Sequence, residues 1–236
     1  MAGRPLGPIE RAVGWMVGMP FASWRYVSRE VHIRTDDSTC RWPIEGFPEG
    51  DPGHPGDGST LQPAPSGFGV AFRRRYSVRV ERPVLRASEL MSIVANDPNV
   101  ACPLEIARFE RDEGRSGPIA AGEEMRVRLP GPWNGPVRVV DVDDCSFRLA
   151  TLQGHLEAGE IRFGARDEGE DLLFEIESWA RSSDRITDFF YDRLGIAREL
   201  QLDMWAFFLE RVTQVSGGTA AQGIEVHTER CEDHPY

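Results

Sequence analysis

The sequence predicts an α+β protein in which one curved, antiparallel β-sheet wraps around a long C-terminal α-helix. Three observations support this fold class: short segments in which apolar and charged residues alternate, turns between them that are too short for a crossover helix, and one long amphipathic stretch near the C-terminus. Strands joined by tight turns are antiparallel neighbours. A sheet with one apolar face needs a cover, and the amphipathic stretch can supply it.

Four regions are distinguished along the 236 residues. Residues 1–42 form an extension with several aromatic side chains and a short helix expected over 9–18. Residues 43–67 are rich in proline and glycine, which disfavours a helix or a strand ladder and indicates a linker. The compact domain is expected over 68–218, followed by a C-terminal tail over 219–236.

Seven segments have the composition and the turn boundaries of strands: 68–81, 102–110, 122–129, 136–142, 146–152, 159–166 and 171–180. After the first of them, Ser88 can cap a short helix that ends before Asn96. The core is expected to contain Phe147, Leu149, Ile161, Phe163, Phe174, Ile176, Phe208 and Leu209. The opposite sheet face is charged, and Glu175 and Glu177 are expected to pair there with Arg162 or Arg148.

The C-terminal helix is predicted from the cluster that ends at Asp184 to about residue 214, before Gly217. Its apolar residues recur every three or four positions: Ile186, Phe189, Phe190, Leu194, Ala197, Leu200, Met204, Trp205, Phe208 and Val212. Gly195 interrupts the pattern, so a kink or break is expected there. A strand, a short helix, six more strands and a long helix follow the element order of the helix-grip fold.

Composition argues against several classes of function. The net charge of -11 repels phosphate backbones, so nucleic acid is not an expected partner. No apolar run approaches the ~18 residues that cross a bilayer, so no membrane span is expected. The four cysteines (Cys40, Cys102, Cys145 and Cys231) lack metal-binding spacing and argue against a disulfide scaffold, which favours a reducing cytoplasm. No metal site and no cofactor are predicted, because no phosphate loop, dinucleotide-binding glycine motif or zinc-binding His-Glu-x-x-His occurs.

Two stretches resemble a known family. Residues 147–163 read Phe-Arg-Leu-Ala-Thr-Leu-Gln-Gly-His-Leu-Glu-Ala-Gly-Glu-Ile-Arg-Phe, and residues 177–182 read Glu-Ser-Trp-Ala-Arg-Ser. Together with Arg198-Glu-Leu-Gln201, they resemble DUF1990, an uncharacterised family of bacteria and plants. DUF1990 belongs to the START-like (SRPBCC) superfamily, which includes the birch pollen allergen. The resemblance implies a bacterial protein with the helix-grip fold and a ligand cavity, because superfamily relatives bind lipids, sterols, polyketides or hormones; the fold alone names no ligand.

The leading hypothesis is a module that binds a small hydrophobic or amphipathic molecule between the sheet and the C-terminal helix. The candidate ligand-binding residues are His155, Glu157, Glu160, Ser178, Arg181, Tyr191, Gln201 and Trp205. Ser178 shares the parity of the apolar residues of its strand, and Tyr191, Gln201 and Trp205 bring polar atoms onto an apolar helix face. If Arg181 is buried, it needs a carboxylate partner or an anionic ligand.

Alternatives to this hypothesis stay open. The protein could be an enzyme in which His155 is the acid or base, Glu157 or Glu160 orients it and Arg181 holds an anionic group. The simplest view of the turn at His155 is purely structural. The third alternative is a non-catalytic interaction module. Large apolar residues crowd one N-terminal stretch: Trp15, Met16, Met19, Phe21, Trp24 and Tyr26. We expect this stretch to pack on its own domain, with a homodimer as the alternative.

Overall fold

The structure is a computed structural model that describes residues 32–42, 61–104, 107–112, 114–129, 134–183 and 196–233. In these ranges one mixed sheet has nine strands in the order β1-β9-β2-β8-β7-β6-β5-β4-β3. The strands are β1 (Ile33–Trp42), β2 (Phe68–Val80), β3 (Arg108–Arg111), β4 (Glu124–Arg128), β5 (Asn134–Asp143), β6 (Ser146–Thr151), β7 (Glu157–Glu168), β8 (Asp171–Ser182) and β9 (Ile224–Asp233). The helices are α2 (Ala87–Asn96) and α4 (Ile196–Ser216), with 3-10 turns at η1 (Ala64–Ser66) and η2 (Pro98–Val100).

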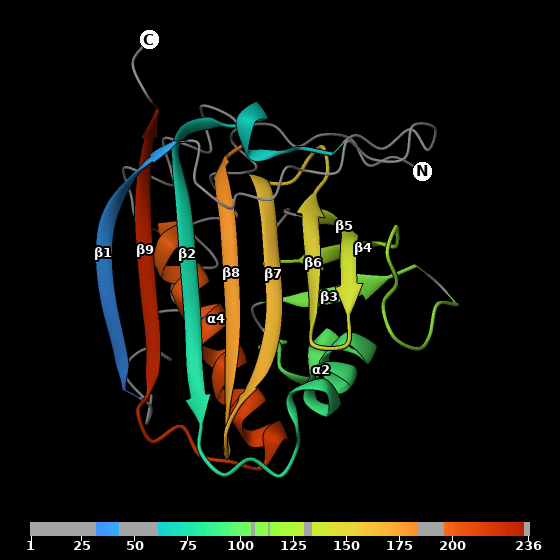
Figure 1. The fold of residues 1–236 in the computed structure, drawn as a ribbon. Helices are drawn as coiled ribbons and strands as arrows, with labels where there is room; N and C mark the ends of the chain where they lie inside the picture. The colour runs from blue at the N-terminus through green and yellow to red at the C-terminus, as the bar shows by residue number, and fades with distance from the viewer. Residues whose placement is uncertain are drawn as a thin grey trace.

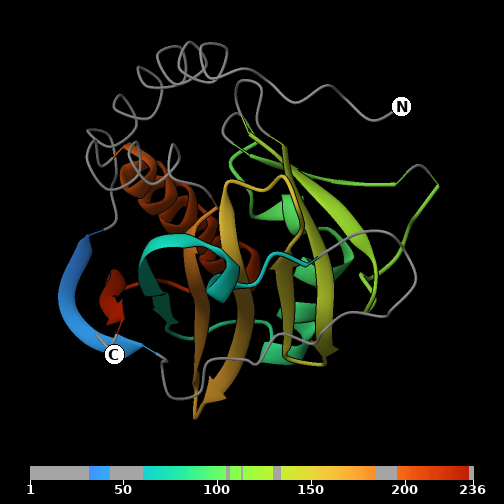
Figure 2. The ribbon, with the colours of Figure 1, turned by 90° about the horizontal axis from the view of Figure 1, so that it is seen from above.

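The predicted fold class is confirmed, because the sheet curves around α4 and each predicted strand has a counterpart (Figures 1 and 2). Consecutive strands from β3 to β8 pair antiparallel, as their short turns predict, and β2 pairs antiparallel with β8. The largest shift of a boundary concerns β3, which was expected from residue 102 and begins at Arg108. The 3-10 turn η2, over residues 98–100, precedes this segment. The Asn99 side chain then bonds both the N–H and the carbonyl oxygen of Phe109, which fixes the start of β3.

Aromatic rings join the sheet to α4. The Phe163 ring stacks on Phe147 at 4.8 Å between centroids, and meets Trp205 at 5.4 Å and Phe208 at 5.5 Å. Phe163 and Phe208 are both fully buried. Of the expected core residues, only Ile161 departs from the prediction; it is half-buried and packs against the edge of the core.

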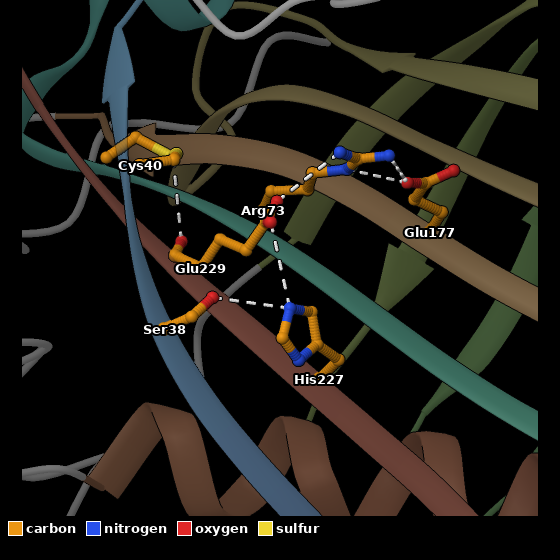
Figure 3. Close-up of a disulfide and its surroundings, with 7 residues drawn as sticks. Ser38, Cys40, Arg73, Glu177, His227 and Glu229 are labelled. Atoms are coloured by element: carbon orange, nitrogen blue, oxygen red, sulfur yellow. Dashed lines mark hydrogen bonds and ion pairs between the residues drawn. A yellow bond between two sulfur atoms is a disulfide. The ribbon is translucent and has the colours of Figure 1, made fainter.

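The parallel pair β1·β9 was not predicted. Residues 224–233 had been assigned to a tail, whereas they form β9 and pair with both β1 and β2. Ile224 and Val226 are buried and alternate with charged residues, but two apolar positions gave too short a pattern to indicate a strand. Cys40 lies directly opposite Cys231 in this pair, and the two form a disulfide with Cα atoms 4.4 Å apart (Figure 3). The absence of regular cysteine spacing therefore did not exclude a disulfide, because the two cysteines meet through the sheet.

The helices end where local chemistry satisfies their backbone groups. The N-cap of α2 is Arg86 and not Ser88, and the Glu89 carboxylate accepts a hydrogen bond of 2.8 Å from the Arg86 N–H. Helix α4 ends before Gly217, whose φ of 76° suits glycine.

Residues 184–195, with Tyr191 and the break expected at Gly195, lie outside the described residues. The same holds for the apolar stretch within residues 1–31.

Residues 61–67, the end of the predicted linker, form a strap across the upper ends of β6, β7 and β8 on the face away from α4 (Figure 1). We call this segment the outer strap. Leu61 pairs with Leu152, and the Gln62 side chain donates to the carbonyl oxygens of His155 and Glu157. Ala64, within the outer strap, is fully buried. The last part of the predicted linker, residues 61–67, therefore belongs to the compact domain.

The outer face of the sheet carries ion pairs, as the alternation predicts, but the partners differ. Glu177 accepts from Arg73 at 2.7 Å and from Arg75 at 3.2 Å, and Glu175 pairs with Arg166. We had expected Arg162 or Arg148 as partners. The register places both Arg75 of β2 and Arg162 of β7 directly opposite Glu177, and the ion pairs of Glu177 form on the β2 side.

Candidate functional site

The faces of the sheet are fixed by the ring contacts with α4. Phe174 and Phe163 both contact Phe208, so even-numbered residues of β8 and odd-numbered residues of β7 face the helix. The cross-strand register extends this inner face to β2 and β9, where it includes Arg74 and Thr228. Candidate residues on the inner face are therefore separated from those on the outer face by the sheet itself.

A polar row crosses the otherwise apolar inner face. Arg74 stands directly opposite Ser178 on one side and Thr228 on the other. All three are buried, with exposed fractions of 3%, 6% and 7%. From the helix, Gln201 accepts a hydrogen bond of 3.1 Å from Arg74 Nη1 and donates one of 2.9 Å to Glu157 Oε1. This polar row thus joins β9, β2, β8, α4 and β7 at one end of the core.

The indole N–H of Trp205 is buried and makes no hydrogen bond within the described part of the chain. The hydroxyls of Ser178 and Thr228 lie on the inner face in the same region. Trp205 is buried and lies one helical turn after Gln201, beside Phe163. Buried polar groups are normally paired, so each exception asks for a partner such as a ligand or water.

His155 holds the hairpin between β6 and β7. Its Nδ1 accepts a hydrogen bond of 2.9 Å from the Glu157 N–H, which requires a proton-free Nδ1. The ring packs so closely on β5 that a Cβ at Gly135 would lie 2.8 Å from Nε2. Burial lowers the pKa of His155, partly offset by the Glu157 carboxylate. A neutral, packed His155 is suited to fixing the turn and so to placing Glu157.

Gly159 lets β7 approach β8 closely. A Cβ at this position would overlap the carbonyl oxygen of Trp179. The Gly159 N–H also donates to Thr151 Oγ1 at 3.0 Å, and the same hydroxyl donates to Gln62 O at 2.8 Å. Packing therefore accounts for the glycine that follows the Gly-His turn in the sequence.

Glu160 and Arg181 lie on the outer face, away from α4. Arg181 Nη1 donates to the Gly69 carbonyl oxygen at 2.8 Å, and the outer strap covers its stem at Gly67. Glu160 is 5% exposed and lies 3.5 Å from Arg148 Nε. Burial raises the pKa of Glu160, and the nearby Arg148 partly opposes this. The residues of the enzyme hypothesis are thus divided between the two faces and do not converge on one reacting atom.

The candidate residues therefore separate into groups. Glu157, Ser178, Gln201 and Trp205 lie on the inner side; His155 is in the hairpin; Glu160 and Arg181 are on the outer face. Sequence reasoning missed Arg74 and Thr228. The parity of Arg74 with Phe72, Tyr76 and Val78 was a usable signal, because it places the middle arginine of the Arg73-Arg74-Arg75 triplet among buried positions. Thr228 had no such signal, since β9 was not predicted.

The sequence also matches the model of a protein family. Residues 104–215 match the family model of DUF1990, a domain of unknown function. This confirms the resemblance seen in the Gly-His turn and the segment that follows it. The DUF1990 match covers β3 to β8 and almost all of α4, so it includes Glu157, Ser178, Gln201 and Trp205. It leaves out β1, β2 and β9, and with them Arg74 and Thr228.

Three solved structures are similar to this chain over part of its length. The di-domain ARO/CYC StfQ from the steffimycin biosynthetic pathway has a TM-score of 0.45 and 12% identity, over 63% of this chain and 51% of its own. Norcoclaurine synthase from Thalictrum flavum, in complex with dopamine and hydroxybenzaldehyde, has 0.44 and 8%, over 62% and 87%. Major latex-like protein 151 from Panax ginseng has 0.38 and 17%, over 57% and 95%. No curated protein matches the sequence.

Two further observations concern partners. Within the residues that the structure describes, no group of three His, Cys, Asp or Glu side chains is arranged to hold a metal ion. Neither helix of the described ranges is long and apolar enough to span a membrane.

Proposed function

We propose that this protein binds a small amphipathic molecule between the inner face of the sheet and α4. The single observation that carries the proposal is the buried indole N–H of Trp205, which has no hydrogen-bond partner in the described residues and lies on the side of α4 that packs against the sheet. A ligand with a polar acceptor atom would supply the hydrogen bond that this group lacks.

The remainder of the inner face favours an apolar body for the ligand. Next to the polar row lie Tyr76, Ile176, Phe163 and Val226, all buried. Apolar contact supplies most of the affinity for such molecules, and a few placed polar groups set their orientation. The polar row would therefore hold one end of the molecule and the aromatic cluster the other.

The candidate residues on the outer face, Glu160 and Arg181, make contacts within the fold instead. Arg181 donates to the backbone of Gly69, and Glu160 lies beside Arg148. We therefore do not include them in the proposed ligand site. The cytoplasmic location and the packing of the N-terminal stretch stay predictions.

The test is ligand capture with a matched pair of variants. Protein purified from its host is examined by native mass spectrometry, and binding of the neutral dye Nile red is followed by its fluorescence. Ser178→Leu fills the inner face and should weaken dye binding. Ser77→Leu makes the same change on the outer face of β2, opposite Glu175, and should leave binding unchanged. No small molecule in the mass spectrum and no dye binding would refute the proposal.

A further inference from the structure

We propose that the Cys40–Cys231 disulfide is a redox-sensitive latch, whose reduction releases β1 from the sheet while the remainder of the domain stays folded. The inference does not depend on the proposed ligand. Both cysteines lie outside residues 104–215, so the match to the DUF1990 family model does not account for them. Among the described strands β1 is the outermost, and it is bonded to β9 in a parallel pair (Figure 1).

β1 buries little apolar surface of its own. Residues 34–37 are exposed, and Ile33 packs against the edge of the main core at one end of the strand. At the other end Cys40 joins a small, separate cluster around Trp179. An edge strand that buries so little opens locally at a low cost in free energy. The disulfide therefore holds β1 at the end that the main core does not reach.

Polar contacts between β1 and β9 oppose the release and must be weighed. Arg34 Nη1 lies 4.0 Å from Glu225 Oε1, but both side chains are 62% exposed, and surface ion pairs of this kind add little stability. His227 makes closer contacts, with Nδ1 3.0 Å from Asp36 Oδ2 and Nε2 3.3 Å from Ser38 Oγ (Figure 3). Asp36 is 79% exposed, so water can replace its partner when β1 leaves.

The exposure of the two cysteines sets the order of the exchange reaction. Cys231 is fully buried, whereas Cys40 is half-buried on the outermost strand. The thiolate of an external dithiol therefore attacks Cys40 Sγ, forms a mixed disulfide with it and releases Cys231 as a thiolate. The second thiol of the same reductant then displaces Cys40 Sγ and closes the reductant's own disulfide. Two electrons and two protons thus pass from the dithiol to the cysteines, and the cross-link is lost.

Release of β1 changes which strand ends the sheet. β9 becomes the outermost strand, and its backbone groups on the β1 side face solvent. β9 itself stays bonded to β2 from Ile224 to Cys231, and its apolar residues Ile224 and Val226 are buried in the main core. The opening therefore ends at β9.

The test is hydrogen–deuterium exchange of the full-length protein, measured by mass spectrometry before and after treatment with the dithiol dithiothreitol. Titration of reactive thiols in denatured samples should find two before the treatment and four after it. The amides of β1 should then exchange faster by roughly tenfold or more, while those of β7 and β8 keep their rates. Reoxidation with oxidised glutathione should restore slow exchange in β1, as a reversible latch requires.

Two variants separate the latch from a general effect of the reductant. Cys145→Ser removes a free cysteine and should respond to dithiothreitol as the unmodified protein does. Cys40→Ser should exchange quickly at β1 without treatment, and dithiothreitol should change nothing further; if this variant does not fold, the unmodified protein decides. The proposal is overturned if dithiothreitol leaves the disulfide intact, if β1 keeps slow exchange once it is reduced, if β7 and β8 accelerate together with β1, or if reoxidation does not restore slow exchange.

Discussion

Replacing Cys40 and Cys231 together by serine removes the covalent link between β1 and β9 and should lower the stability of the protein. The two cysteines are 191 residues apart in the sequence. A cross-link over a loop of that length restricts the unfolded chain by about 5 kcal/mol in the chain-entropy model, whereas measured disulfides typically contribute about 2–4 kcal/mol. We therefore expect a loss of about 2–5 kcal/mol. For a chain of this size each kcal/mol shifts Tm by about 2–4 °C, so Tm should fall by roughly 5–15 °C.

Thermal unfolding followed by circular dichroism measures this change under non-reducing conditions. Cys145→Ser is the matched control, because Cys145 is a free, half-buried cysteine. Thiol titration of the denatured, unreduced protein should find two of the four cysteines reactive, since Cys102 and Cys145 are free. The reasoning is refuted if all four cysteines react, or if the double variant unfolds at the same temperature as the unmodified protein.

Three further changes test the packing described above. Gly159→Ala should prevent folding or strongly reduce the yield of folded protein, because the new methyl group overlaps the Trp179 carbonyl oxygen; a normal circular dichroism spectrum would contradict this. Phe163→Ala should lower the free energy of unfolding by about 3–5 kcal/mol in urea titration, since the ring is fully buried among aromatic neighbours. Glu160→Gln should stabilise the protein at pH 7. Burial holds the pKa of Glu160 above its ordinary value of 4.5, so its favourable contribution exists below that pH and is lost as the pH rises through the folded-state pKa. The gain in the free energy of unfolding from Glu160→Gln should therefore shrink below about pH 4.5. A gain of the same size at pH 7 and below pH 4.5 would count against the argument.

The parts of the fold that were predictable are those in which neighbours in sequence are neighbours in space. Alternation along β7 and β8 fixed the buried positions of Phe163 and Phe174, because hairpins pair consecutive strands in a determined register. The edge of the sheet was not predictable in this way. β1 pairs with β9 across almost the whole chain, and the sequence of β1 contains too few apolar residues to signal a strand.

The candidate site also contains residues that the sequence could predict and residues that it could not. Ser178, Gln201 and Trp205 were identified from parity and helical spacing, and the structure places them around one layer. Arg181 was expected near the open end of the grip, but its odd position on β8 turns it to the outer face, where a backbone carbonyl meets it.

The pairing of β1 with β9 also sets an order of events during synthesis. β2 is made early, yet the strand that covers one of its edges, β9, begins at Ile224. At about 5–20 residues per second, the ribosome needs roughly 10–40 s to make the 191 residues that separate Cys40 from Cys231. During that time β1 lacks the strand that it pairs with in the fold, and Cys40 lacks its disulfide partner Cys231. The nascent chain must therefore keep an early segment unpaired and a thiol reduced until its last strand emerges, which makes the edge of β2 the place where premature association with another chain would begin.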